Sequence, residues 1–322
     1  MPAKIVYWAA YGLAKSQIIE AFEGLEGIDL HICSSLDEVL PAMDGARGLI
    51  VYDAPEDVAG QVIAKLNEPG NIVEKLHFVS AGRDGFERAG LPRHVEVSGP
   101  GSATGPAVAE HALALTLASL RAIPQAQSQA RAEIWSRHGV VPHMASLEDR
   151  TVAVIGYGAI GKAVSRLLRA FGASVTAVTR SPPAPGEGGD LNVVSLEAIR
   201  DVVAGSDIVV VTIALAPETI GMFDAELLGA IKPGSYFVNV ARGELVDMEA
   251  LEALLRSGRL AGAALDVVWP EPLPEGHSLW TAPNLIITPH VAAAGSLAGA
   301  RRLAAAARRH ILPLATQETG RS

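Results

Sequence analysis

The chain has 322 residues, of which 49% are hydrophobic and only 19% are charged. This length and composition are typical of two globular domains and exclude a largely disordered chain. The formal net charge of −9 argues against a general nucleic-acid-binding protein, because such proteins carry a basic face. Cys33 is the only cysteine, which excludes an intrachain disulfide and a cysteine-based zinc site.

Nothing in the sequence resembles a targeting or membrane segment. No N-terminal stretch combines basic residues, an apolar run and a cleavage site, and the longest apolar runs are broken by Gly, Pro or charge before they could span a bilayer. We therefore expect a soluble cytoplasmic protein that binds neither membranes nor nucleic acid, and no metal site is predicted.

The first hundred residues alternate short apolar strands with helices. Helices are expected at Lys15–Phe22, 36–43 and 58–66, and strands at residues 4–7, 29–32, 48–52, 76–79 and 95–97. Because strands that alternate with helices form parallel sheets with right-handed crossovers, this part predicts a small α/β unit.

A Gly/Pro-rich crossing at residues 100–106 leads into long apolar helices at 107–123 and 125–137. The β-α alternation then restarts, with a helix at 247–257 that Gly258 would end and strands at 152–155, 174–178, 207–213, 235–240, 260–264 and Leu285–Ile287. A final Ala/Arg-rich helix is expected at 296–311, and its Arg pairs at 301–302 and 308–309 are interpreted as a solvated face, not a nucleic-acid site.

These elements predict an α/β fold of two doubly wound parallel-sheet domains with an interdomain cleft. Residues 100–290 would form a Rossmann-type dinucleotide-binding domain. Residues 1–99 and 291–322 would form a flavodoxin-like substrate domain. Because ligands bind beyond the carboxyl ends of parallel strands, functional residues are expected on the strand-end loops.

The glycine-rich turn of residues 152–161 (VAVIGYGAIG) lies between a predicted buried strand and a predicted helix, the context that the G-x-G-x-x-G fingerprint requires. Gly156 would allow the tight turn, Gly158 would let the backbone approach a pyrophosphate, and Gly161 would let helix and strand pack closely. The free N–H groups and the positive end of the helix would then hold the phosphates.

The turn after the next strand bears on the choice of cofactor. NAD sites usually place Asp or Glu there to bind the ribose hydroxyls, but this chain has Thr179, Arg180 and Ser181. A guanidinium suits a 2′-phosphate by charge and bidentate geometry, so NADP(H) is preferred, and NAD(H) stays open.

Four further motifs, at residues 214–219 (ALAPET), 238–247 (VNVARGELVD), 262–272 (GAALDVVWPEP) and 287–290 (ITPH), make the chain resemble the D-isomer-specific 2-hydroxyacid dehydrogenase family, and in particular its glyoxylate and hydroxypyruvate reductases. Upstream, residues 79–84 (VSAGRD) and 108–115 (VAEHALAL) are similar to the family's substrate loop and interdomain helix. The resemblance covers nearly the whole chain.

The resemblance implies a catalytic triad of Arg242, Glu271 and His290, and the chemistry of a 2-keto acid reduction supports it. Arg242 follows an apolar strand, and its planar fork can hold a carboxylate and a ketone oxygen together. His290 carries the proton most easily moved near neutral pH. Glu271 would hydrogen-bond the imidazole and raise its pKa.

Other roles come only from the resemblance. Ala81 and Gly82 would offer backbone N–H groups to the substrate carboxylate, and Asp266 would bind the nicotinamide amide. The remaining cofactor-binding residues would be Ala159 and Ile160 over the pyrophosphate, with Ile213, Val240 and Ala241 along the cofactor. Arg83 departs from the family's usual apolar or aromatic residue, so it either meets the substrate or pairs with Asp84 at the surface. Relatives typically associate through the helices at 107–137, which predicts a homodimer.

The leading hypothesis is an NADP-linked reductase of a small 2-keto acid, glyoxylate or hydroxypyruvate. The alternative within the enzyme class is an NAD-linked dehydrogenase of a bulkier D-2-hydroxy acid. A formate dehydrogenase is disfavoured, because that chemistry resembles a Gln–His pair and this chain has Glu271. A dinucleotide-sensing corepressor is the alternative from another class.

Overall fold

The computed structural model describes residues 1–182 and 190–316, which fall into two compact units. The first unit joins Met1–Thr104 with the segment that begins at Ala294, and the second unit is Gly105–Ala293. The sequence placed the corresponding boundaries at residues 99 and 290. Each unit is described by itself below.

The first unit is built on a five-stranded sheet in the order β2-β1-β3-β4-β5, in which every neighbouring pair is parallel. This is the flavodoxin-like order that the sequence predicted. The strands are β1 (Ala3–Trp8), β2 (Ile28–Cys33), β3 (Gly48–Val51), β4 (Lys75–Phe78) and β5 (Glu96–Ser98).

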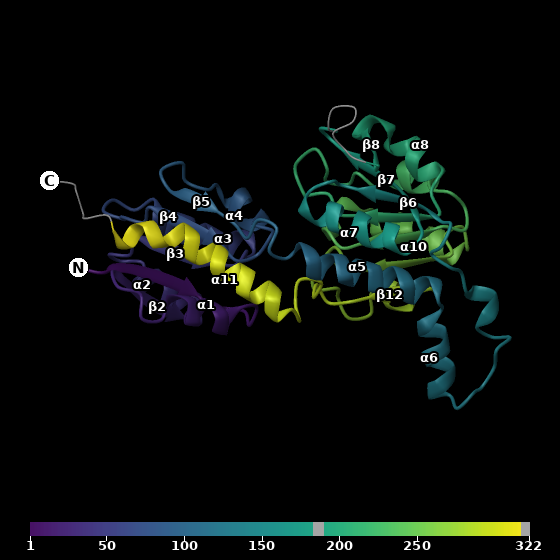
Figure 1. Cartoon of the computed structure of the whole chain (residues 1–322), viewed down its shortest axis with the longest axis horizontal. Coiled ribbons are helices and arrows are strands. Elements are labelled where there is room, and N and C mark those ends of the chain that lie inside the picture. Colours follow the sequence, from purple (N-terminus) through teal and green to yellow (C-terminus); the bar gives the residue numbers. More distant parts are fainter. Residues whose placement is uncertain (183–189, 317–322) are drawn as a thin grey trace. The chain divides into compact units, whose positions relative to one another are not determined.

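Alternate residues of β1 pack on opposite faces of this sheet. Ile5 and Tyr7 pack with α1 and α11, whereas Val6 and Trp8 pack with α2, α3 and α4, as the period of two in a strand requires. Figure 1 shows α11 crossing the sheet beside α1. The helices are α1 (Lys15–Phe22), α2 (Leu36–Ala42), α3 (Glu56–Leu66), α4 (Asp84–Ala89) and α11 (Leu297–Ile311).

The second unit contains a seven-stranded, fully parallel sheet in the order β12-β11-β10-β9-β6-β7-β8. The order reverses between β6 and β9, which is the switch point at which Rossmann-type sheets bind dinucleotides. The strands are β6 (Thr151–Ile155), β7 (Ser174–Thr179), β8 (Asn192–Ser195), β9 (Ile208–Val211), β10 (Tyr236–Asn239), β11 (Gly262–Leu265) and β12 (Leu285–Ile287).

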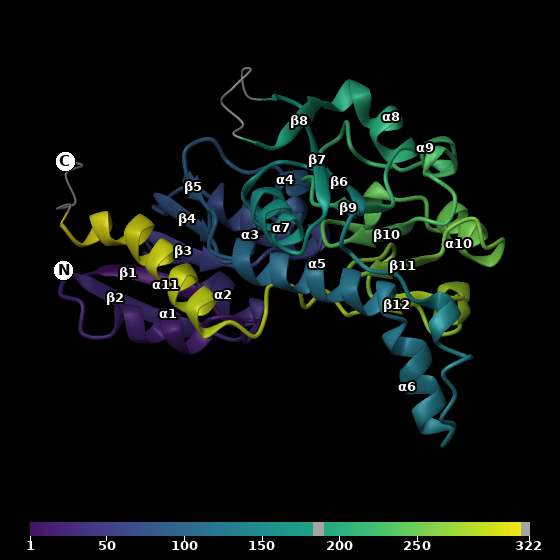
Figure 2. The same cartoon turned by 45° about the vertical axis from the view of Figure 1, so that its right-hand side comes forward.

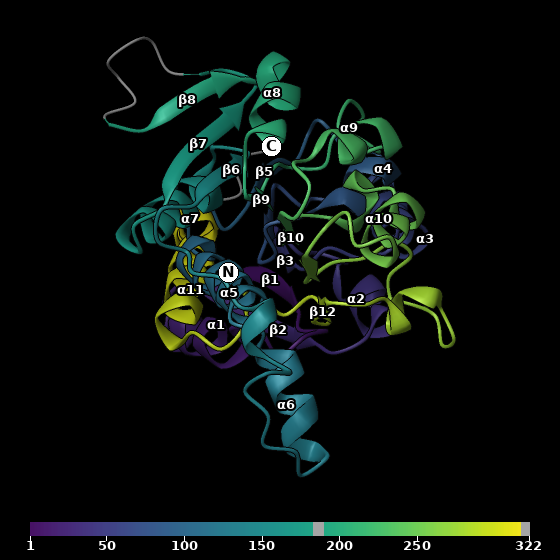
Figure 3. The same ribbon diagram turned by 90° about the vertical axis from the view of Figure 1, so that its right-hand side faces the viewer.

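Helices cover both faces of this sheet, with α5 and α7 packed against each other on one of them and β8 at its outer edge (Figure 3). The helices are α5 (Gly105–Leu120), α6 (Ile123–Arg131), α7 (Ala159–Ala170), α8 (Ile199–Ala204), α9 (Ala225–Ala230) and α10 (Met248–Arg256). In the described part of the chain, none of the helices has the length and apolar character needed to cross a bilayer. The predicted pair of doubly wound parallel sheets is confirmed.

The sequence prediction missed β8, α4, α8 and α9 and extended α5 and α6 too far. The missed elements have four to six residues, too few to establish a periodicity. The helix predicted at 107–123 ends at Leu120, because Ala122 turns to a φ of 50° before Pro124. The helix predicted at 125–137 ends at Arg131, and Glu133 then takes a φ of 58°.

Candidate functional site

The three predicted catalytic residues follow three neighbouring strands. Arg242 comes after β10, Glu271 after β11 and His290 after β12, and these strands are adjacent and parallel. Because the carboxyl ends of parallel strands share one edge of the sheet, the three loops gather at one end of that edge.

His290 and Glu271 form the hydrogen bond that the sequence predicted. The imidazole Nδ1 lies 2.7 Å from Glu271 Oε1, and the side chains are 46% and 38% exposed. The hydrogen bond to Glu271 raises the pKa of His290, while burial opposes the increase. The shift favours the protonated form of the imidazole, and among the described residues its Nε2 makes no hydrogen bond.

Arg242 lies close enough for its charge to lower the pKa of His290. Its Nη1 donates to Ala241 O at 2.7 Å. The turn that carries it is held by Asn239, which is fully buried, donates from Nδ2 to Arg242 O and accepts from Ala241 N. Sequence reasoning missed Asn239, although an amide inside an apolar strand is a signal that could have identified it.

Asp266 holds the loop that carries His290. Its carboxylate is 1% exposed and accepts hydrogen bonds from Thr288 Oγ1, Val291 N and Ala292 N at 2.6–3.0 Å, with His111 Nε2 at 3.3 Å. The backbone N–H of His290 also donates to Asp266 O at 2.8 Å. These bonds keep His290 at a φ of 52°, a conformation that side-chain-bearing residues seldom adopt without support. The nicotinamide contact expected of Asp266 stays a prediction.

The glycine loop between β6 and α7 has the geometry of a phosphate cradle. Gly156 has a φ of 107°, and a Cβ on Gly161 would lie 1.9 Å from Gly156 O, so neither position accepts a side chain. A Cβ on Gly158 would meet nothing within 4 Å, which leaves open space above the backbone. Gly158 caps α7 without a side-chain hydrogen bond, so the first N–H groups of the helix remain available to an anion. These residues fit a dinucleotide pyrophosphate.

The remaining residues predicted along the cofactor lie on the same edge. Ile213, Val240 and Ala241 are buried next to the sheet, Ile160 is half-buried, and Ala159 is exposed at the start of α7. An apolar wall beside a polar phosphate cradle is the usual composition of a cofactor site.

The turn after β7 differs from the sequence expectation in one respect. Arg180 forms an ion pair with Glu218, which follows β9. Thr179 is half-buried and Ser181 is exposed beside it. The sequence shows no carboxylate after β7, but the fold supplies one from 38 residues further along the chain. Arg180 would have to leave Glu218 in order to bind a 2′-phosphate.

In the first unit, the predicted substrate loop is held by two polar side chains. Ser80 Oγ donates to Gly82 O and accepts from Asp53 N, and Asp53 accepts from the N–H of Gly85. Within the described residues, the N–H groups of Ala81 and Gly82 donate to no protein acceptor, so both could meet a carboxylate. Sequence reasoning missed the roles of Ser80 and Asp53, which depend on the pairing of β3 with β4.

Arg83 forms an ion pair with Glu87 one helical turn along α4, with Nε 2.7 Å from Oε1. The prediction considered Asp84 as its surface partner and not Glu87. Spacing of four residues is the ordinary geometry for such a pair, and its value at the surface is about 0.3–0.5 kcal/mol.

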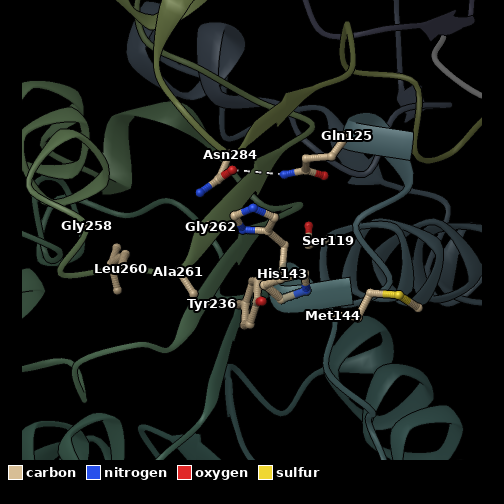
Figure 4. Close-up of a pocket in the computed structure, with 11 residues that line it drawn as sticks. Ser119, Gln125, His143, Met144, Tyr236, Gly258, Leu260, Ala261, Gly262 and Asn284 are labelled. Carbon is tan, nitrogen blue, oxygen red and sulfur yellow. Dashed lines mark hydrogen bonds between the residues drawn. The ribbon is translucent and has the colours of Figure 1, made fainter. Parts of the chain in front are cut away.

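A separate pocket of about 240 Å³ lies at the amino ends of β10, β11 and β12 (Figure 4). Tyr236, Gly262 and Asn284 line it, and Gln125 hydrogen-bonds Asn284 across it at 2.9 Å. None of the residues predicted for catalysis or cofactor binding lines this pocket. Among the residues that the structure describes, no group of three His, Cys, Asp or Glu side chains could hold a metal ion.

Comparisons with known proteins agree with this geometry. The family described as D-isomer specific 2-hydroxyacid dehydrogenase, NAD binding domain, matches residues 113–292. The mouse (Mus musculus) protein named glyoxylate reductase/hydroxypyruvate reductase is 35% identical over 58% of this chain and 57% of its own length. The D-3-phosphoglycerate dehydrogenase of Mycobacterium leprae is 35% identical over 80% of this chain and 47% of its own length.

A solved structure shows the same fold along almost the whole chain. The D-isomer specific 2-hydroxyacid dehydrogenase of Xanthobacter autotrophicus Py2, in complex with NADPH and MES, has a TM-score of 0.77 and 32% identity, covering 96% of this chain and 94% of its own. The chain spans about half the length of the curated relatives that it matches.

Proposed function

The chain belongs to the D-isomer specific 2-hydroxyacid dehydrogenase family, and on that premise we propose that it reduces a small 2-keto acid to the D-2-hydroxy acid with NADP(H). The observation that carries the proposal is the His290–Glu271 hydrogen bond of 2.7 Å, with its raised imidazole pKa, beside the Arg242 guanidinium. A general acid next to a cation is the pair of groups that carbonyl reduction of a 2-keto acid requires.

In this mechanism the bound nicotinamide supplies the hydride. Arg242 binds the substrate carboxylate and orients the ketone oxygen with its fork of N–H donors. His290 donates the Nε2 proton to that oxygen as negative charge develops on it. Glu271 holds the ring through Nδ1 and keeps it protonated before the reaction. In the oxidation direction the neutral imidazole accepts the same proton.

Arg180 supports the preference for NADP(H). An exposed guanidinium with two neighbouring hydroxyls, Thr179 and Ser181, suits a 2′-phosphate. The alternative cofactor is NAD(H), and one observation supports it. Glu218 already neutralises Arg180, and its carboxylate could accept hydrogen bonds from the ribose hydroxyls of NAD(H).

Glyoxylate and hydroxypyruvate are the proposed substrates, supported by the name of the mouse relative. The test is the oxidation of NADPH and NADH, followed by absorbance, with glyoxylate, hydroxypyruvate, pyruvate and bulkier 2-keto acids. We expect the highest kcat/KM with NADPH as cofactor and either glyoxylate or hydroxypyruvate as substrate. Faster turnover of a bulkier acid with NADH would favour the alternative, and no turnover of any 2-keto acid would overturn the proposal.

We also propose that two copies associate through α6 and the segment that follows it. In Figures 1 and 2 this helix projects from the rest of the second unit, and it buries none of its own residues. Trp135 is 98% exposed, and Ile134 and Val141 are also exposed. Apolar side chains gathered on a projecting arm are typical of an interface. Light scattering should give a dimer, and Trp135→Lys should shift it toward monomer; a monomeric wild-type protein would contradict the proposal.

A further inference from the structure

A basic groove lies along α11 in the first unit. Its volume is about 520 Å³, within the ordinary range for small-ligand sites. One wall is a stripe of α11 at the spacing i, i+3, i+4, i+7 and i+8, and the other is the turn after β5. The lining residues of the helix are Arg302, Ala305, Ala306, Arg309 and His310, and those of the turn are residues 98–103.

The charges that line this groove are all of one sign. No Asp or Glu lines it, although the chain as a whole carries a net charge of −9. Within the described residues, neither Arg302 nor Arg309 forms an ion pair. Arg302 Nε donates to Ala103 O at 3.1 Å, which fixes the guanidinium beside the turn after β5. The two alanines between the arginines leave room for a ligand.

The turn after β5 adds neutral donors on the opposite wall. Among the described residues, the N–H groups of Gly99, Gly101 and Ser102 have no protein acceptor. Gly101 has a φ of 59°, and a Cβ on Gly99 or Gly101 would meet nothing within 4 Å. Of these, Gly101 and Ser102 offer two successive N–H groups, the arrangement from which an anion-binding nest is built, whereas Pro100 has no N–H.

Burial lowers the pKa of both histidines beside the groove, which disfavours their charged forms. His310 Nε2 lies 3.1 Å from Glu96 O, and burial lowers its pKa. Its ring lies 5.9 Å from that of His77, which is fully buried and whose Nδ1 lies 2.7 Å from Ser98 Oγ. His310 therefore braces the end of the groove, and the two guanidiniums supply its charge.

We propose that this groove binds a small anion that carries phosphate or carboxylate groups. Planar guanidiniums bind both groups through paired N–H donors, and the nest of backbone N–H groups completes the site from the other side. None of its residues belongs to the predicted substrate or cofactor site, so binding there does not depend on the proposed reaction.

The test is calorimetric titration of the full chain with inorganic phosphate and with citrate, at neutral pH and constant ionic strength. Arg309→Ala is the cleanest variant, because the Arg309 side chain has no hydrogen bond to the described protein. It should weaken binding about ten-fold, the usual effect of removing one charge-assisted pair of hydrogen bonds. The affinity of Arg309→Lys should lie between those of the wild type and Arg309→Ala, because lysine keeps the positive charge but lacks the paired N–H donors of the guanidinium.

Arg308→Ala and Arg301→Ala are the matched controls, since they remove the same charge from the same helix outside the groove. Both should bind as the wild type does. If phosphate binds more tightly than citrate, the ligand of the groove is assigned as a phosphate ester. If citrate binds more tightly, the ligand is assigned as a polycarboxylate. Equal losses in Arg308→Ala and Arg309→Ala, retained binding in Arg309→Ala, or no wild-type binding tighter than about 1 mM would overturn the proposal.

Discussion

The carboxyl ends of the strands of the seven-stranded sheet form one edge, and the two ends of this edge are built differently. At the end formed by β10, β11 and β12, buried side chains hold the predicted catalytic residues: Asn239 holds the turn of Arg242, and Asp266 holds the loop of His290. At the end formed by β7, Arg180 is 61% exposed, and the one contact that its side chain makes with the described residues is a surface ion pair with Glu218. Surface pairs contribute about 0–1 kcal/mol, whereas a buried carboxylate with several donors contributes more. The predicted catalytic geometry is thus held by the core, whereas the proposed preference for NADP(H) over NAD(H) depends on exposed side chains.

The largest effect should come from His290→Ala. Loss of the general acid should lower kcat for 2-keto acid reduction by about a hundred-fold or more. The glycine loop and the β7 turn are untouched, so NADPH binding, measured by nicotinamide fluorescence, should stay near the wild-type value. Turnover within a few-fold of the wild type would remove His290 from the catalytic site.

Asp266→Ala should show how strongly the catalytic end is held by the core. The substitution removes the acceptor of three hydrogen bonds around the His290 loop, which should cost about 3 kcal/mol in the free energy of unfolding. Urea denaturation measures the change, and Arg180→Ala is the matched control, with an expected cost below about 1 kcal/mol. Equal costs at the two positions would mean that the two ends are not built differently.

Glu271→Gln should move the pH dependence of reduction. The Glu271 carboxylate raises the pKa of His290, and reduction needs the protonated imidazole, so the rate falls as the pH rises through that pKa. Glutamine keeps the size and a hydrogen bond but loses the charge, so the fall should occur at lower pH. Near neutral pH we expect a loss of roughly ten-fold. An unchanged profile of kcat/KM against pH would show that Glu271 does not set this pKa.

The smallest effects should come from the β7 end. Arg180→Ala should weaken NADPH binding about ten-fold and leave NADH binding nearly unchanged, because only the 2′-phosphate needs the guanidinium. Glu218→Gln should strengthen NADPH binding a few-fold, because Arg180 no longer pairs with a carboxylate. Dissociation constants for both cofactors measure this, and equal changes for NADPH and NADH would contradict the phosphate assignment.

Much of this protein could be read from local patterns. Apolar runs that alternate with helical periods indicated both parallel sheets, and the glycines of residues 156–161 indicated the phosphate turn, because strand, turn and helix signals each lie within a few consecutive residues. The apolar strands that precede Arg242 and His290 placed these two residues at strand ends, Glu271 was placed in a proline-rich loop, and the catalytic roles of all three came from the family resemblance. Elements of four to six residues, such as β8 and α8, were missed because they contain too few residues to show a periodicity.

The partners of the polar side chains could not be read in the same way. That Asp266 accepts from Val291 and Ala292, that Glu218 pairs with Arg180, and that Arg302 and Arg309 face the turn after β5 all follow from which strands and helices become neighbours. Strand order and helix packing bring together residues that are 25 to 199 positions apart. Hydrogen bonds and ion pairs act over a few ångströms of space, so only the packed fold determines which ones form.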